Sequence, residues 1–370
     1  MTDTSSPPRR PRIAICCQGG GSQTAFTAGA LKALLQEGVH REFDLVTLTG
    51  TSGGAICAAL AWYGLRRGDP APWERLEEFW QANTAQTLPE QMFNDAMVTT
   101  LRTVSRGHLP VVQTSPAAPM MQLMTSLTGM MMRPEFFDLR LLLERHIDFE
   151  EVARWGTEGP TPNLLMGAVD ILAGQLRVFS SRLDHYTPDH ILASCAVPNL
   201  FPAVPMEGSA FWDGLFSDNP PIAETIRRRY VGEPNVPDEI WVIKINPTRA
   251  RSVPEAPEEI GDRRNQLIGN MSLFQQLHAI DQLCELHAMD AFRPEFIKQL
   301  ELDHGVRLPR GFDEDPPRDW HIPFIEMSQE LQATLDYESK LDRNPRNITT
   351  LMQDGERQAR AFLAARASGA

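Results

Sequence analysis

The chain has 370 residues, of which 42% are hydrophobic and 22% are charged, so it is long enough to bury a sizeable core in one or two domains. Its formal net charge of -13 at pH 7 excludes non-specific binding to nucleic acid and steady attraction to an anionic membrane. No run of about 18 apolar residues occurs, and we therefore predict no membrane-spanning segment.

The chain opens with MTDTSSPPRRPR, a polar and proline-rich stretch, and we assign residues 1–11 to a flexible tail. The apolar run behind it is too short for the hydrophobic core of a secretory signal. The cysteines are odd in number, scattered and without the spacing of a zinc site. We therefore expect reduced thiols, a cytoplasmic location and no metal site. The five cysteines are Cys16, Cys17, Cys57, Cys195 and Cys284.

Two strand and helix units follow the tail. Residues 12–17 are apolar and predict a buried strand, which a glycine-rich loop joins to a helix within 24–38 that has one apolar face. Residues 43–50 predict a second strand, and the segment 54–65 is apolar nearly all round, as in a buried helix. Strands that alternate with helices indicate a parallel sheet covered by helices.

Five more strands are predicted along the chain. Residues 163–171 and 175–181 flank a turn at Ala173 and Gly174 and predict a hairpin in the same sheet. The others are expected within 211–216, 239–245 and 320–327. From about residue 255 the pattern becomes helical, with a long amphipathic stretch over 265–289 and a closing helix over 347–367.

These elements predict an α/β domain over residues 12–250 and a mainly helical extension over 251–370 packed on it. Within the first, residues 90–135 are poorly periodic and rich in methionine, which adapts to irregular apolar partners. This segment is interpreted either as a small satellite core or as a lid over an acyl chain. Its methionines near the centre are Met120, Met121, Met124, Met130, Met131 and Met132.

A nucleophile motif lies between the second strand and the buried helix. Residues 50–54 fit G-x-S-x-G, in which a sharp strand-to-helix turn exposes the serine oxygen. The rival interpretation is a purely structural turn, but the flanking strand and helix are the context that the motif requires. The motif consists of Gly50, Thr51, Ser52, Gly53 and Gly54.

A serine hydroxyl needs a base and donors for the developing oxyanion, and the loop of Gly19, Gly20 and Gly21 is a candidate source of backbone NH donors. A dinucleotide-binding fingerprint is the alternative for this loop. It fails because Thr24 stands at its third glycine and Asp44 opens the second strand rather than closing it.

Four segments in this order resemble the landmarks of the patatin-like phospholipase family: GGGSQTAFTAGAL, GTSGG, ASCAVPNLFPAV and DGLFSDNP. The resemblance covers about residues 12–247. It implies an α/β fold of three α/β/α layers with a mainly parallel sheet, followed by the helical extension. It also implies a catalytic dyad of Ser52 and Asp213 that needs no histidine and no cofactor. Oxyanion donors would come from Gly20 and Gly21, with Gly19 and Gly214 shaping turns.

The chain departs from the family pattern at three positions. Members usually carry arginine or lysine where this chain has Gln23, and glycine where it has Thr24. The missing cation weakens the case for an anionic head group and leaves room for neutral esters. Leu215 replaces a small residue after Asp213 and Gly214 and is expected to narrow or reshape the pocket. Pro198 and Pro202 are given a structural role.

We expect a cytosolic enzyme that hydrolyses acyl ester bonds of lipids through an acyl-enzyme on Ser52, with transient contact to a lipid surface. Two alternatives stay open: acyl transfer to an alcohol by the same dyad, and a lipid-binding protein with a silent dyad. The oligomeric state is left open. A triad in the order Ser, Asp, His is also considered, since four histidines follow Asp213. They are His278, His287, His304 and His321.

Overall fold

The computed structural model describes residues 10–110, 115, 126, 129, 131–157, 159–250, 252–289, 291–296, 298–299 and 322–368. Most of the tail predicted for 1–11 and the centre of the methionine-rich segment lie outside these residues. Among the helices that are described, none combines the length and the apolar character needed to cross a membrane. The four cysteines whose side chains are described, Cys16, Cys17, Cys57 and Cys195, are free and buried.

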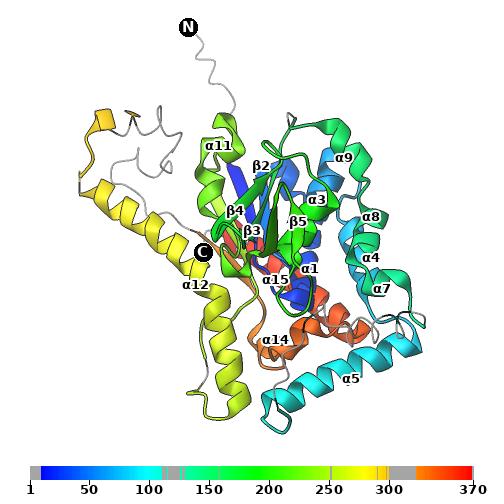
Figure 1. Cartoon of the computed structure of the whole chain (residues 1–370). Coiled ribbons are helices and arrows are strands. Elements are labelled where there is room, and N and C mark those ends of the chain that lie inside the picture. Colours follow the sequence, from blue (N-terminus) through cyan, green and yellow to red (C-terminus); the bar gives the residue numbers. More distant parts are fainter. Residues whose placement is uncertain are drawn as a thin grey trace.

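An eight-stranded mixed sheet forms the centre of the molecule (Figure 1). Its order is β5-β6-β3-β2-β1-β7-β8, with β4 also paired to β3. Strands β1, β2, β3, β7 and β8 run parallel, and β4 and β6 are antiparallel to β3. The strands are β1 (Arg12–Cys17), β2 (Asp44–Gly50), β3 (Asn163–Asp170), β4 (Gln175–Ser180), β5 (Val204–Met206), β6 (Ser209–Asp213), β7 (Glu239–Lys244) and β8 (Phe324–Glu326).

Helices cover both faces of this sheet. The longer ones are α1 (Ala25–Gln36), α3 (Gly53–Arg67), α4 (Glu74–Asn83), α5 (Leu88–Ser105), α8 (Leu139–His146), α10 (Pro188–Cys195), α12 (Pro257–Ala288) and α15 (Pro345–Ala367). The short helices are α2 (Val39–Glu42), α7 (Pro134–Phe137), α9 (Phe149–Trp155), α11 (Arg228–Val231) and α14 (Gln329–Gln332). Turns of 3-10 helix are η1 (Gly21–Thr24), η2 (Gly214–Phe216), η3 (Ala223–Ile226), η4 (Glu233–Asn235) and η6 (Glu338–Leu341).

The alternation of side chains along β1 explains the layers. Ile13 and Ile15 point into the larger core, which holds apolar residues of α1, α3 and α15. Ala14 and Cys16 point to the other face, where they pack with Leu273 of α12 and residues of η3. In Figure 1, α12 accordingly lies across the sheet from α4 and α8. This arrangement confirms the predicted α/β fold with a mainly parallel sheet between two helical layers.

The last helix packs unusually close to the first. A Cβ on Gly29 of α1 would lie 2.0 Å from the carbonyl oxygen of Met352, and one on Gly355 of α15 would lie 2.1 Å from that of Phe26. Only glycine lets the two backbones approach this closely. The closing helix and β8 are thus joined to the same core as β1 and α1, although they come from the extension predicted for 251–370.

Local outcomes differ from the sequence predictions in two places. The predicted strand over 211–216 ends at Asp213, and residues 214–216 form the 3-10 turn η2 instead. In the last predicted strand, 320–327, the first two residues lie outside the described residues, and among the others only Phe324–Glu326 form a strand. The hairpin over 163–181 is confirmed by the antiparallel pairing of β3 and β4.

A buried ion pair joins the two ends of the segment 90–135, which the sequence predicts as a possible lid. Glu90 of α5 is fully buried and accepts hydrogen bonds from the Arg133 guanidinium at 2.8 and 3.0 Å and from the Arg133 backbone NH at 3.0 Å. Burial by itself raises the pKa of Glu90, but these bonds and those from the NH groups of Gln86 and Thr87 outweigh it and lower that pKa to about 2.

We expect Glu90→Gln to destabilise the fold by about 3 kcal/mol at pH 7, because Arg133 then lacks its buried partner. The pKa of Glu90 is lower in the folded state, so its contribution is complete above pH 4.5 and is lost as the pH falls toward 2. Urea denaturation at pH 7 and pH 3 should show the gap to wild type narrowing. The control Glu37→Gln breaks an exposed pair with Arg360 and should cost less than about 1 kcal/mol; an equal cost for both variants would contradict the prediction.

Candidate active site

Ser52 sits in a strained turn between β2 and α3. Its φ of 56° and ψ of -131° lie in a region that non-glycine residues rarely adopt. The Ser52 NH donates to both the backbone oxygen and the Oγ of Ser194, each at 3.1 Å, which holds the turn from the side of α10. The side chain itself is only half-buried. This conformation is the one that a nucleophile elbow requires.

Close backbone contacts explain the glycines around Ser52. A Cβ on Gly50 would lie 2.4 Å from the carbonyl oxygen of Gly54, and a Cβ on Gly54 would lie 2.3 Å from that of Cys17. A Cβ on Gly53 would lie 2.1 Å from the Thr24 hydroxyl. The elbow is therefore packed directly against the end of β1 and the glycine-rich loop. Thr51 donates its hydroxyl to the carbonyl of Asp218 at 2.6 Å.

The sheet brings Asp213 to this elbow. The first half of β3 pairs with β2, and its second half pairs with β6, so that Ala168 lies opposite Asp213. The chain then turns at Gly214, where a Cβ would lie 2.4 Å from the carbonyl oxygen of Gly167 and 3.0 Å from the Thr51 side chain. Asp213, more than 160 residues after Ser52, thereby ends its strand beside the turn that carries the serine.

The Asp213 carboxyl is completely buried. Its Oδ1 accepts a hydrogen bond from the Leu215 NH at 2.8 Å, whereas Oδ2 has no hydrogen-bond partner among the described residues. Burial raises the pKa of Asp213 to about 7, against the opposing effect of the nearby Ser52 hydroxyl and the Leu215 NH. Ser52 is near enough to lower the pKa of Asp213, but Oδ2 accepts no hydrogen bond from the described residues; catalytic hydrogen bonds are often unformed in unliganded sites.

The glycine-rich loop lies alongside. The Gly19 NH donates to Asn219 Oδ1 at 2.6 Å, and a Cβ on Gly19 would lie 3.0 Å from that of Ser52. The NH groups of Gly20 and Gly21 have no partner among the described residues, and neither has the NH of Gly53 at the start of α3. Free NH groups at a helix start favour negative charge.

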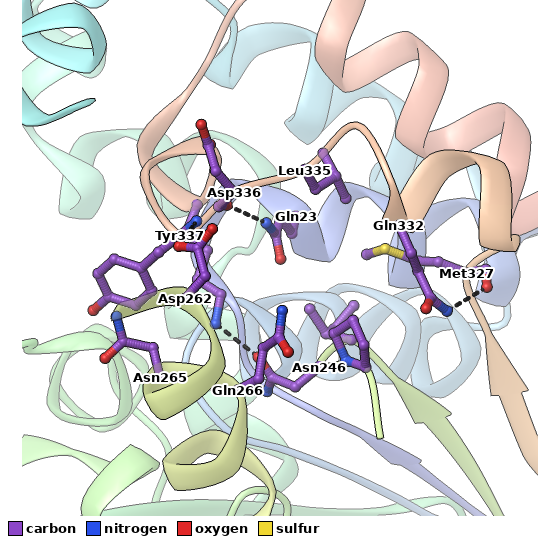
Figure 2. A pocket seen from close by; sticks show the side chains of 13 residues that line it. Gln23, Asn246, Asp262, Asn265, Gln266, Met327, Gln332, Leu335, Asp336 and Tyr337 are labelled. Atoms are coloured by element: carbon purple, nitrogen blue, oxygen red, sulfur yellow. Dashed lines mark hydrogen bonds between the residues drawn. The ribbon is translucent and has the colours of Figure 1, made fainter. Parts of the chain in front are cut away.

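Gln23, which stands where family members usually carry arginine or lysine, makes structural hydrogen bonds. Gln23 is buried and donates its amide to the Asp336 carbonyl at 3.1 Å and to Ser339 Oγ at 2.8 Å (Figure 2). Thr24 donates its hydroxyl to the Gly21 carbonyl at 2.6 Å. Both departures from the family pattern therefore fasten the loop. Leu215 is half-buried and serves Asp213 through its backbone NH.

A lysine from the C-terminal segment lies in the same pocket as Gln23. The Lys340 ammonium donates to Asn246 Oδ1 at 2.7 Å and lies 5.3 Å from the centre of the Tyr337 ring. Burial lowers the pKa of Lys340 to about 8. Burial raises the pKa of Tyr337, and the charges of Glu338 and Asp213 raise it further. Tyr337, which lines this pocket, is therefore close enough to Asp213 to interact with its charge.

Sequence reasoning gave no role to Ser194, Asn219 or Gln18, although the first two stand inside the motifs ASCAVPNLFPAV and DGLFSDNP. Motif membership was the available signal, but their partners are remote in sequence. No histidine hydrogen-bonds to Asp213 among the described side chains, and His278 is exposed on α12. The side chains of His287, His304 and His321 are outside that part of the chain.

Within the ranges that the structure describes, no group of three or more histidine, cysteine, aspartate or glutamate side chains is arranged to hold a metal ion.

Solved structures match this one with low TM-scores. The structure is similar to that of VipD from Legionella pneumophila, with a TM-score of 0.38 and 14% identity over 94% of this chain and 67% of that one. It is also similar to a chain of the heterodimeric ExoU-SpcU complex from the type III secretion system of Pseudomonas aeruginosa. That match has a TM-score of 0.29 and 16% identity over 81% of this chain and 58% of that one. No curated protein matches the chain.

The family described as patatin-like phospholipase matches residues 15–226, which is more than half of the sequence. This match confirms the resemblance drawn from the four ordered motifs, and it indicates lipid acyl hydrolysis as the general activity. The protein therefore belongs to the patatin-like phospholipase family.

Proposed function

We propose that this protein hydrolyses carboxylic ester bonds of lipids, with Ser52 as the nucleophile and Asp213 as the general base. One observation carries the proposal: the Asp213 carboxyl is buried near the Ser52 hydroxyl, its Oδ2 accepts no hydrogen bond from the described residues, and burial raises its pKa to about 7. A base with a pKa near the working pH is suited to take a proton from a hydroxyl. Family membership supports a lipid ester as the substrate.

In the first half of the reaction, Ser52 Oγ forms a bond to the ester carbonyl carbon and its proton passes to Asp213. The tetrahedral intermediate collapses, the bond to the alcohol breaks, and the departing alcohol oxygen takes the proton from Asp213. A water molecule then attacks the acyl-enzyme and gives its proton to Asp213. The fatty acid leaves as Ser52 Oγ regains that proton, so both groups return to their starting state.

The oxyanion of each tetrahedral intermediate is stabilised by backbone NH groups of the glycine-rich loop. Gly20 and Gly21 are assigned as the donors because their NH groups are unpartnered among the described residues, whereas that of Gly19 is occupied by Asn219. The free NH of Gly53 is a further donor at the start of α3, in the position that follows the nucleophile. Gly19, Gly50, Gly54 and Gly214 permit the close backbone contacts.

We also propose that residues 12–250 form the catalytic domain, with 251–370 as a mainly helical extension packed on it. The segment 90–135 is assigned as a lid that contacts the acyl chain or the lipid surface. Support for the lid comes from its methionine content and from two exposed apolar residues at the start of α5, Met92 within the segment and Leu88 just before it.

Replacing Ser52 by alanine removes the nucleophile. We expect ester hydrolysis to fall by more than the roughly 1,000-fold that the loss of one oxyanion donor costs. Intact-mass analysis after exposure to a fluorophosphonate ester should find one adduct on wild type and none on Ser52→Ala. Ser181→Ala, which alters a buried serine that accepts from the Leu164 NH, should keep the adduct. An unlabelled wild type, or wild-type hydrolysis by Ser52→Ala, would refute the dyad.

The rate of labelling should depend on pH through Asp213. Below pH 7 the carboxyl is mostly protonated and cannot accept the proton of Ser52, so the wild-type rate should rise with pH and level off above about 7. Asp213→Asn should label far more slowly at every pH, because an amide is not a general base. A wild-type rate that is constant between pH 5 and pH 8 would contradict this role.

The same residue should reduce the stability of the fold at alkaline pH. The pKa of Asp213 is higher in the folded state than its ordinary value of 3.8, so the native state favours the protonated form and loses stability as the pH rises through about 7. Asp213→Asn should therefore raise the melting temperature relative to wild type more at pH 8 than at pH 4.5. Calorimetry of both proteins at the two pH values measures this, and an equal shift at both would be the contrary result.

A further inference from the structure

A group of buried amide side chains lies beneath the glycine-rich loop. Gln18, the residue before Gly19, uses all its hydrogen-bonding capacity: Oε1 accepts from the NH groups of Ile245 and Asn246, both at 2.9 Å. Its Nε2 donates to the Gly269 carbonyl at 3.1 Å and to Asn270 Oδ1 at 3.0 Å. The root of the loop is thereby tied both to the end of β7 and to α12.

Asn219 ties the loop to the same point on α12. Its Oδ1 accepts from the Gly19 NH, and its Nδ2 donates to the Gly269 carbonyl at 3.2 Å. Its own backbone NH donates to Ser272 Oγ at 3.0 Å. The Gly269 carbonyl therefore receives both Gln18 and Asn219. A Cβ on Gly269 would lie 2.6 Å from Asn246 Nδ2, so a larger residue there would make either α12 or the Asn246 side chain shift.

A third contact comes from the C-terminal segment. The Lys340 carbonyl lies against Gly21, where a Cβ would be 2.2 Å away, and the Lys340 ammonium holds Asn246. In the pocket of Figure 2, Gln23 meets the same segment through Asp336. Gly269, Asn270 and Lys340 all lie beyond residue 226, where the match to the family ends.

We propose that Asn219 is a positioning residue for the oxyanion donors, and that Gly269 of α12 is the anchor through which it acts. Occupation of the Gly19 NH by Asn219 fixes the orientation of the first peptide of the loop. The following NH groups of Gly20 and Gly21, which have no partner among the described residues, are then held in place for the oxyanion that forms at Ser52. This inference rests on the proposed function. It adds that the part of the chain outside the family match completes the catalytic apparatus.

Two variants test it from opposite ends. Asn219→Ala removes the acceptor for the Gly19 NH. Gly269→Ala leaves Asn219 in place but adds a methyl group that would lie 2.6 Å from Asn246 Nδ2, so that α12 or the Asn246 side chain must shift. Because displacement of catalytic groups by about 1 Å costs roughly 100-fold in rate, kcat for a soluble ester should fall by about 10- to 100-fold in each, with KM changed by less than about threefold.

Matched controls separate positioning from loss of structure. Asn163→Ala removes a buried amide that donates to the Val231 carbonyl at 2.9 Å and lies at the start of β3, away from the loop. Gly261→Ala adds a methyl group to α12 at a position with open space. Both controls should keep kcat within about threefold of wild type, although Asn163→Ala should lower the melting temperature about as much as Asn219→Ala.

The outcomes are distinct. A fall in kcat for Asn219→Ala and Gly269→Ala, without a similar fall in the controls, supports the proposal. An unchanged kcat in Asn219→Ala, a rise in KM at constant kcat, or an equal loss in Asn163→Ala overturns it. If Asn219→Ala does not fold, Gly269→Ala against Gly261→Ala decides by the same criteria. Failure of the proposed function would instead be seen in wild type, as the absence of a fluorophosphonate adduct on Ser52.

Discussion

The chemistry of this site depends on the desolvation of one carboxyl group. Asp213 is completely buried, and no cation among the described residues contributes to its pKa, which burial raises to about 7. An arginine or lysine beside it would stabilise the carboxylate and make it a weaker base. The fold thus buries Asp213 where its charged form is unfavourable. At neutral pH this lowers the free energy of unfolding, but it leaves a carboxyl group that can accept a proton.

That burial is achieved by backbone contacts. Gly214 lies against the Gly167 carbonyl, Gly54 against the Cys17 carbonyl, and Gly19 beside Ser52. Any side chain at these three positions would separate segments that must touch, so water would reach the carboxyl and Asp213 would move away from Ser52. The strained φ of Ser52 belongs to the same arrangement, because the elbow is held by Ser194 on one side and by the end of β1 on the other.

The loss of the family's cation at position 23 is linked to the C-terminal segment. The side-chain amide of Gln23 donates hydrogen bonds to the Asp336 carbonyl and to Ser339 Oγ. The same segment is bound to α5, where Arg102 pairs with Asp336 at 2.6 Å and Ser105 donates to Glu338. Residues 336–341 therefore stand between α5, at the start of the lid segment, and the loop assigned to the oxyanion. Lys340 brings a positive charge to this neighbourhood from a different part of the chain.

Local sequence pattern was sufficient to predict most of the secondary-structure elements near the site and the short motifs. Apolar periodicity predicted the strands β1, β2, β3, β4 and β7 and the helices α1, α3, α12 and α15, and four short motifs predicted the family. Glycines at 19–21 and 50–54 were recognised because a tight turn and a close backbone approach demand that residue within a few positions. The end of β6 was predicted less well, since the transition from strand to 3-10 turn at Gly214 is imposed by contacts with Gly167 and Thr51.

The contacts that these elements and motifs make with distant segments became known from the folded structure. Asp213 lies next to Ser52 because β6 pairs with the second half of β3. Pairing between strands that are distant in sequence cannot be recognised from the local sequence pattern. The pKa of Asp213, the tie from Asn219 through Gly269, and the entry of Lys340 all depend on segments separated by 50 to 200 residues or more. The sequence specifies which groups are present, but burial and hydrogen bonding between distant segments set their chemical properties, and those exist only once the chain has folded.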